Sequence, residues 1–582
     1  MKKRLSNLLL ALLLPILALA QDSTLTIETD SVNQLSRLLP DTLRYTMEGL
    51  KVTGPINGND LRIIKLIASH TAARKKGEHV LKELDLSEAI LTESKGLFRT
   101  SNEAFPAAMF VNSKTLERIV LPEGMASISK SCFSGCVSLK EVILPDGLSL
   151  IDDNAFLNCT SLKAISLPST ISIIASHAFE GCSSLDSISL PETFGTLGNY
   201  AFAKCANMKK ADIKGAIIQI GKGVFAGCEQ LAMFEVPATV TAIGDDAFKG
   251  CTALERIALP RNLATIGSSA FEGCNSLFRI AMPVATDIGR MAFKNCQKLA
   301  SVTIESNARL GKNAFEGCTS LATLNIDGSL QEIEDETFLG CSSLQNVVLP
   351  STVKEIGKRA FAECKSLTGI ELPGSVAEIG TGAFTQCTSL KSITLPKLVK
   401  ELGSSAFEGC ASLDSVCVLG YISAIDDATF RNCHSLRSIT LPVSVKEIGD
   451  NAFEQCSLLS HIELPISVSS IGDEAFCLCL SLRSMTIPTA CKDIGSEAFR
   501  ECTSLASLEF SPALRKIGSN AFAKCVSLRE IVCRSPLPPA ITGNTFKGVI
   551  TTACKVIVPR GARNTFRNDK YWKKMTQIVE AF

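Results

Sequence analysis

One stretch, residues 338–361, contains the pattern that decides the fold: Phe338-Leu-Gly-Cys341-Ser-Ser-Leu344-Gln-Asn-Val347-Val-Leu349-Pro350-Ser-Thr-Val353-Lys-Glu-Ile356-Gly357-Lys-Arg-Ala360-Phe361. The alternation around Val347 predicts a short strand that buries Val347 and Leu349 and turns Asn346 and Val348 outward. Pro350 has no N–H to donate, so it ends the strand. Val353 and Ile356 form a second inward pair, which leaves room for a brief second strand. A tight helical or 3₁₀ turn is expected between Gly357 and the next Phe-x-x-Cys.

This pattern repeats along most of the chain. From Cys136 to Cys525 there are eighteen cysteines at steps of 23 residues, with two steps of 22, and each has a phenylalanine three residues before it. The frame extends one unit upstream to Phe110, where Ser113 takes the cysteine position, which gives nineteen regular units ending before Phe546. A 23-residue unit cannot enclose a core alone, whereas stacked units make a continuous one. The sequence therefore predicts a repeat solenoid that is mostly β.

The composition follows from the repeat. The chain has 582 residues, 24 Cys, 28 Phe and a single Trp, and eighteen of the Phe and eighteen of the Cys are repeat positions. Lys and Arg number 59 against 58 Asp and Glu, so no basic surplus favours nucleic acid or an anionic membrane as the partner.

The repeat resembles the BspA-like (Treponema-type) leucine-rich repeats of bacterial surface proteins. The resemblance covers roughly residues 110–545 and rests on the eighteen Phe-x-x-Cys units. It implies a curved right-handed solenoid with a parallel sheet along one face, and it implies adhesion to host or neighbouring-cell proteins. The region before the repeats is similar, more loosely, to the N-terminal caps of such proteins in Bacteroides-type bacteria.

We divide the chain into four regions. Residues 1–20 have a basic start, an apolar stretch too short to span a bilayer and a final Ala-Leu-Ala, which predicts a cleaved signal peptide. Residues 21–109 are expected to form a small α/β N-terminal cap, residues 110–545 the repeats, and residues 546–582 a C-terminal cap around Trp572. We therefore expect an exported protein at the cell surface or secreted, with the periplasm as an alternative and no transmembrane span in the mature chain.

The N-terminal cap is expected to contain three elements. Leu43–Val52 is predicted as a strand, and 60–70 as a helix with Asp60 as N-cap. Leu81, Leu84 and Leu86 repeat the spacing of the regular units and predict a first rung. At the other end, residues 555–559 are predicted as a last strand, followed by an amphipathic tail.

Catalytic and metal-binding patterns are not evident in the sequence. The cysteines lie 23 residues apart instead of in clustered pairs, so we interpret them as free, buried core residues. Cys417 takes an outward strand position and is the thiol expected to be accessible. The five histidines are scattered, although His461 and Glu463 face outward on one strand. We expect no enzyme activity, no cofactor and no metal.

The outward strand positions are therefore the candidate binding surface. Fourteen of the 38 such positions are Ser or Thr and none is aromatic, while protein hot spots favour Trp, Tyr and Arg. The candidate partner contacts are Arg118, Met233, Glu235, Arg256 and Arg279, with residues 233–279 as the contact zone. We expect a protein partner bound over an extended solenoid face. The alternative is a polysaccharide-binding component of the bacterial envelope, with glycan bound by the loops.

Overall fold

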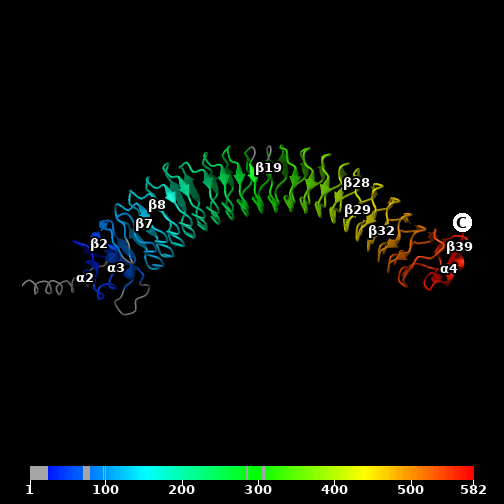
Figure 1. Ribbon diagram of the computed structural model, residues 1–582, viewed down its shortest axis with the longest axis horizontal. Helices are drawn as coiled ribbons and strands as arrows, with labels where there is room; N and C mark the ends of the chain where they lie inside the picture. Colours follow the sequence, from blue (N-terminus) through cyan, green and yellow to red (C-terminus); the bar gives the residue numbers. More distant parts are fainter. Residues whose placement is uncertain are drawn as a thin grey trace, which may run out of the picture. The chain divides into compact units, whose positions relative to one another are not determined.

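The computed structural model describes residues 24–69, 79–95, 98, 100–283, 286–304 and 308–581. The chain divides into two compact units, an N-terminal unit to Pro260 and a C-terminal unit from Arg261. Each unit is a solenoid of stacked coils joined by parallel strands (Figure 1). The expected signal peptide lies outside the described residues.

Each regular coil has two strand positions, and each position builds its own parallel sheets. In the N-terminal unit the first position is occupied by β5 (Arg118–Val120), β7 (Glu141–Ile143), β10 (Ser187–Leu190), β12 (Lys210–Ile213), β14 (Met233–Glu235) and β16 (Arg256–Ala258). The second position is occupied by β6 (Ser127–Ile128), β8 (Leu150–Ile151), β9 (Ile173–Ile174), β11 (Thr196–Leu197), β13 (Gln219–Ile220) and β15 (Ala242–Ile243).

The C-terminal unit repeats this arrangement. Its first strands are β19 (Ser301–Ile304), β20 (Thr323–Ile326), β22 (Asn346–Val348), β24 (Gly369–Glu371), β26 (Ser392–Leu395), β28 (Ser415–Val418), β30 (Ser438–Thr440), β33 (Ser484–Thr486), β35 (Ser507–Phe510) and β37 (Glu530–Cys533). Its second strands are β17 (Thr265–Ile266), β18 (Asp287–Ile288), β21 (Glu332–Ile333), β23 (Glu355–Ile356), β25 (Glu378–Ile379), β27 (Glu401–Leu402), β29 (Ala424–Ile425), β31 (Glu447–Ile448), β32 (Ser470–Ile471), β34 (Asp493–Ile494) and β36 (Lys516–Ile517).

The strand register confirms the predicted alternation. Val347 of β22 is buried, whereas Asn346 and Val348 are exposed. Asn346 pairs in register with Gly369 of β24, so equivalent residues of successive coils form rows across the sheet. The second strand expected at Ile356 is also present, as β23.

The third side of the coil is a run of hydrogen-bonded turns. Within a coil, Ala360 N–H donates to Gly357 O at 3.2 Å and Cys364 N–H donates to Phe361 O at 3.2 Å, which are the i→i+3 bonds expected of a tight turn. Between coils, Phe361 N–H donates to Ala383 O at 2.8 Å. Over the described residues of 110–545 these turns do not extend into a helix.

Gly357 is required by close packing between coils. A Cβ atom at this position would lie 2.7 Å from the backbone nitrogen of Asp335 in the preceding coil. The glycine was expected to supply a turn, but its conformation is open to other residues. The close approach of the neighbouring backbone excludes a side chain instead.

The repeat Phe and Cys side chains form two inner ladders. The Phe361 ring stacks between those of Phe338 and Phe384, with centroids 5.4 and 5.6 Å away. The Cys364 thiol donates to Phe338 O in the preceding coil at 3.3 Å. All three phenylalanines and the cysteine are fully buried. The cysteine therefore fills the core and also satisfies a buried carbonyl, because S–H is a weak donor.

The N-terminal region joins the first sheet but differs in detail from the expectation. It contains β1 (Thr24–Glu28), α2 (Leu35–Leu38), β2 (Gly49–Ile56), α3 (Gly58–Ala68), β3 (Glu83–Asp85) and β4 (Ala89–Leu91). The sheet order is β1-β2-β3-β5-β7, so the rung predicted at Leu84 is present. The strand predicted from Leu43 begins only at Gly49, because residues 41–45 form turns that end the preceding segment.

The N-cap of α3 is Asn57, so the assignment of Asp60 was wrong. The Asn57 side chain accepts from Asn59 N–H at 3.0 Å. Asp60 lies at the third helical position and accepts from Asn57 N–H at 3.2 Å, which completes a capping box. The Asp60 carboxylate also accepts from the backbone N–H groups of Asn33 and Leu35, and these bonds hold it in place.

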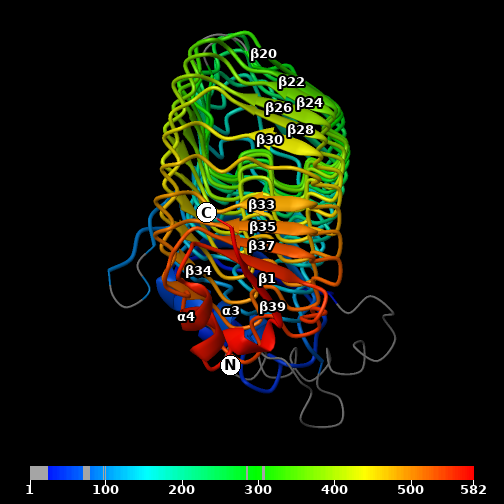
Figure 2. The ribbon, with the colours of Figure 1, turned by 90° about the vertical axis from the view of Figure 1, so that its right-hand side faces the viewer.

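The C-terminal region adds two rungs and covers the last coil. It contains β38 (Lys555–Val558), α4 (Arg563–Asn568), the 3₁₀ helix η2 (Trp572–Lys574) and β39 (Gln577–Glu580). The strands β33, β35 and β37 lie side by side, and β38 and β39 continue their sheet (Figure 2). Trp572 is fully buried against Phe510, Phe546 and Phe566, and its Nε1–H donates to Pro539 O at 2.9 Å. Trp572 therefore packs against the last coil. The strand β39 was not predicted, because the sequence indicated only an amphipathic tail here.

Replacing one ladder phenylalanine tests the assigned register. We expect Phe361→Ala to lower the free energy of unfolding by about 3–5 kcal/mol, because it leaves a cavity between two stacked rings. Urea unfolding of the variant beside the parent chain measures the change. A loss below about 1 kcal/mol would contradict the burial of this row.

Candidate interaction surface

The predicted contact residues of the N-terminal unit lie partly together. Met233 on β14 is 65% exposed and pairs in register with Arg256 on β16. Glu235 lies on the same strand and is also exposed. These three side chains therefore share one strand face, as the alternation predicted.

Arg118 and Arg279 lie elsewhere. Arg118 is on β5, in the sheet that begins at β1, and its Nε is 2.8 Å from a Glu141 carboxylate oxygen on the next strand. That ion pair already occupies the guanidinium. Arg279 is exposed and belongs to the C-terminal unit. Its backbone forms an isolated parallel β-bridge with that of Ser301.

A shallow hollow of about 410 Å³ lies on the strand face near the C-terminal end. Two ion pairs line it, His461 with Glu463 at 3.5 Å and Arg534 with Glu509 at 2.8 Å. Ile466 belongs to the same lining and is 77% exposed. The hollow thus combines polar groups with an exposed apolar side chain, which suits a protein surface as partner.

Ile466 is one end of an apolar ridge that sequence reasoning missed. The ridge occupies the corner between the first and second strands of four consecutive coils. Tyr421 and Val443 within it are 73% and 78% exposed. We call this set the corner ridge, and its members are Leu398, Leu419, Tyr421, Val443 and Ile466.

Coils with Thr or Ser at the second corner position use it for a hydrogen bond, including the ridge coils of Val443 and Ile466 through Ser444 and Ser467. Thr352 Oγ1 donates to Leu330 O in the preceding coil at 2.7 Å, and Ser375 Oγ donates to Val353 O at 2.5 Å. Leu398 and Tyr421 stand where these hydroxyls would be. Among the two-residue corners that the structure describes, Leu, Ile, Val, Met or aromatic side chains occur only in these four coils. The fold therefore does not require the corner ridge.

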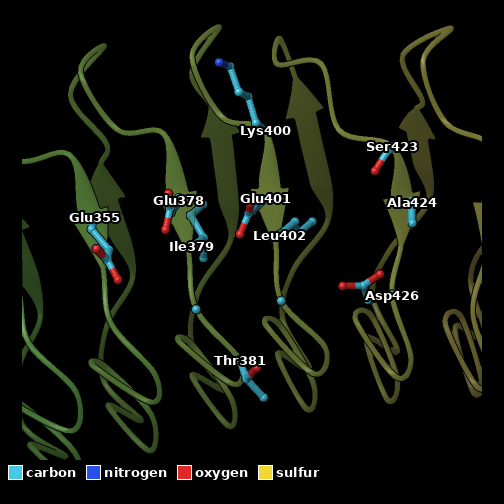
Figure 3. Close-up of a pocket in the computed structure, with 12 residues that line it drawn as sticks. Glu355, Glu378, Ile379, Thr381, Lys400, Glu401, Leu402, Ser423, Ala424 and Asp426 are labelled. Carbon is cyan, nitrogen blue, oxygen red and sulfur yellow. The ribbon is translucent and has the colours of Figure 1, made fainter.

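The second strands carry an acidic row. Glu332, Glu355, Glu378 and Glu401 pair in register across β21, β23, β25 and β27. A hollow of about 410 Å³ lies beside them, and in it the carboxylates of Glu378 and Glu401 lie next to each other while Lys400 points away (Figure 3).

The acidic row is electrostatically unfavourable. Partial burial, and then the adjacent carboxylates, raise the pKa of Glu355 and that of Glu332. Burial and Asp427 likewise raise the pKa of Asp426, which lines the same hollow. Like charges on neighbouring strands destabilise a sheet, so the row weakens the folded state at neutral pH.

Neutralising one carboxylate should relieve this repulsion. We expect Glu355→Gln to raise the free energy of unfolding at pH 7 by about 0.3 kcal/mol, a small value because solvent screens the half-exposed group. A raised folded-state pKa means that the penalty is absent at low pH and grows as pH rises, so the gain should vanish near pH 4.

Urea unfolding between pH 4 and 7 measures this difference, with Gln331→Asn, an exposed neutral residue beside Glu332, as control. An effect of Glu355→Gln that is independent of pH would show that the carboxylate charge is not responsible.

The cysteines are free, as the spacing indicated. All 24 are unpaired, and all but Cys417 are buried, including Cys491 and Cys533. Burial raises the pKa of the Cys410 thiol to about 12. The ladder thiols therefore stay protonated and enclosed at neutral pH.

One group among the described residues has the composition of a metal site. Ligand atoms of Glu454, Glu474 and Cys477 lie within 4.8 Å of one another. However, Glu454 is paired with Arg431 at 2.8 Å, and burial raises the pKa of the Cys477 thiol to about 12. Because Arg431 already balances the charge of the Glu454 carboxylate, this group is explained as part of an ion-pair row.

Thiol titration tests the cysteine assignment. Ellman's reagent should react rapidly with one thiol per folded chain, because only Cys417 is exposed, and with 24 thiols in denaturant. Cys417→Ser should remove the rapid reaction. Far fewer than 24 thiols under denaturing, non-reducing conditions would contradict the free ladder.

Tandem coils of 23 residues, each with a buried Leu-x-x-Ile-x-Leu pattern and a parallel strand, define a leucine-rich-repeat solenoid. The family model described as "BspA type Leucine rich repeat region (6 copies)" matches residues 103–232, 218–338, 308–437 and 423–551. The chain therefore belongs to the BspA-type leucine-rich repeat family.

Solved structures with similar repeats come from several bacteria. A leucine-rich repeat protein from Bacteroides ovatus is 21% identical, with 84% of this chain and 90% of that chain covered and a TM-score of 0.29. A leucine rich cell surface protein from Faecalibacterium prausnitzii is 25% identical over 52% of this chain and 87% of that chain, with a TM-score of 0.35. The leucine-rich repeat protein of T. pallidum is 30% identical over 34% and 72%, with a TM-score of 0.22. No curated protein matches the chain.

Proposed function

We propose that the protein is exported to the cell surface and binds other proteins in adhesion, without catalysis, through the outward side of its coils. Leucine-rich repeat proteins bind protein partners, and BspA-type members are cell-surface proteins. Among the described residues, the helices are too short or too polar to cross a membrane. The basic and apolar start of the sequence supports export.

The observation that carries the proposal is the uneven exposure of apolar side chains on an otherwise uniform scaffold. Met233 on β14 and Val348 on β22 are 65% and 70% exposed, on strand faces where Ser and Thr are common. Folding alone does not require Met233 and Val348 to face outward, and apolar side chains, Met among them, are enriched at the centre of protein contact sites. Met233, Glu235 and Arg256 form one proposed contact region of the N-terminal unit, Arg118 on β5 is a second, and Arg279 in the C-terminal unit is a third.

Two experiments test this function. Protease treatment of intact cells that produce the chain should degrade it while cytoplasmic proteins survive. The mature chain from residue 21 should bind immobilised extracellular matrix or neighbouring-cell surface proteins, and Met233→Ser with Val348→Ser should weaken that binding. Ile218→Ser is the matched control, because Ile218 is also 70% exposed but precedes the second strand β13.

Protection of the chain in intact cells would contradict a surface location. Binding to a glycan array without any binding to proteins would contradict the protein-binding function and favour the polysaccharide alternative.

A further inference from the structure

We propose that the corner ridge is a docking site for an amphipathic α-helix of a protein partner, whose apolar stripe is bordered by acidic residues. This inference rests on the proposed protein-binding function and specifies the partner's chemistry. It concerns the C-terminal unit alone, since all five ridge residues follow Arg261.

The exposure of the ridge indicates a contact surface. Tyr421, Val443 and Ile466 expose about three quarters of their surface, and Leu398 and Leu419 expose about half. Isolated exposed apolar residues are common on soluble proteins, but five of them at one corner of four consecutive coils are not. Leu398 and Tyr421 also forgo the hydroxyl bond to the preceding coil that Thr352 makes. A cost in folding without a folding gain favours a role in binding.

The spacing of the ridge fits a helix. Adjacent parallel strands lie about 4.8 Å apart, so the four coils that carry the ridge span roughly 15 Å. One face of an α-helix carries side chains at intervals of about 5.4 Å. About three turns therefore cover the ridge, with the side chains at i, i+3, i+4 and i+7 packed between the ridge residues. An extended strand would offer a side chain on one face only every 6.8 Å or so, which matches less well.

Lysines beside the ridge specify the charge of the partner. Lys397 is adjacent to Leu398, and Lys400 and Lys446 follow the corner in their coils. All three are exposed, and none forms an ion pair within the described part of the chain. Lys400 points away from Glu378 and Glu401 of the acidic row (Figure 3). Acidic residues along the partner helix would pair with these lysines.

The acidic row disfavours an anionic membrane as the occupant. Glu401 and Glu447 directly follow Lys400 and Lys446 in sequence and are exposed. A planar anionic surface that approaches the lysines would meet these carboxylates as well. A helix about 10 Å wide can contact the ridge and the lysines without covering the acidic row.

Direct binding of designed helical peptides tests the proposal. The probes are two peptides of about 18 residues with the same leucine stripe, one bordered by Glu and the other by Lys. An environment-sensitive fluorophore on the exposed native thiol of Cys417, two residues from Leu419, reports binding to the mature full-length chain. We expect the Glu-bordered peptide to bind at least about tenfold more tightly than the Lys-bordered one, and more weakly as salt rises.

A ridge variant supplies the specificity control. Leu398→Thr, Tyr421→Thr, Val443→Ser and Ile466→Ser together install residues that other coils carry at these positions, so the variant should fold. It should bind the Glu-bordered peptide at least about tenfold less tightly, with an unchanged circular dichroism spectrum. Leu537→Ser with Ile218→Ser removes comparable exposed apolar groups elsewhere and should leave binding unchanged.

Several outcomes would overturn the proposal. The first is equal binding of both peptides, or failure of the Glu-bordered peptide to bind. The second is sedimentation of the parent chain as a dimer that the ridge variant abolishes, which would make a second copy the occupant. The third is ridge-dependent binding to phosphatidylglycerol vesicles. If the ridge variant still binds immobilised surface proteins as the parent does, this inference fails while the proposed function stands.

Discussion

Every coil must present to the next the same backbone and the same side chains at the same height, and the rest of the structure depends on this constraint. Phe361 stacks between Phe338 and Phe384, the Cys364 thiol bonds to Phe338 O, and Phe361 N–H bonds to Ala383 O. Each coil thus completes the hydrogen bonds of its neighbours. A nearly constant repeat length follows, and the two 22-residue steps still keep the rows aligned, since Phe293 stacks on Phe271 and Phe315.

The same constraint separates folding from function. Residues that face the neighbouring coil, such as Gly357, have little freedom, since even a Cβ atom would contact the preceding backbone. Residues that face solvent can vary at a smaller cost to the stack. Departures from the repeat on the outside, such as the corner ridge and Met233, are therefore the candidates for a role in binding.

Much of this structure could be predicted from the sequence because one repeat pattern of about 23 residues runs through most of the chain. The Phe and Cys rows, the outward position of Cys417 and the first rung at Leu84 followed from spacing alone. The thiol bond to a carbonyl could not be predicted, since it depends on where the preceding coil places its backbone. The N-cap at Asn57 could have been predicted, because Asn57 and Asp60 have the Asn-x-x-Asp spacing of a capping box. Asp60 was instead assigned as the N-cap.

The candidate surface was predicted less well. Met233 and Arg256 were predicted as contacts because they take outward strand positions. The corner, where apolar residues replace a hydroxyl, is outside the strands and was not considered. The signal lay in the sequence as Leu398 and Tyr421 in a column otherwise rich in Thr and Ser. The sequence alone could not show that the lost hydroxyl donates a hydrogen bond to a carbonyl of the preceding coil.

The claim that the 23-residue coil is the unit of folding is tested most directly by deletion. Removing residues 338–360 joins Thr337 to Phe361 in the frame that Thr337 and Phe338 have now. The account predicts that this chain unfolds cooperatively, with a circular dichroism spectrum per residue like the parent's, whereas removal of residues 338–348 alone disrupts the C-terminal unit. Equal tolerance of both deletions, or equal disruption by both, would contradict it.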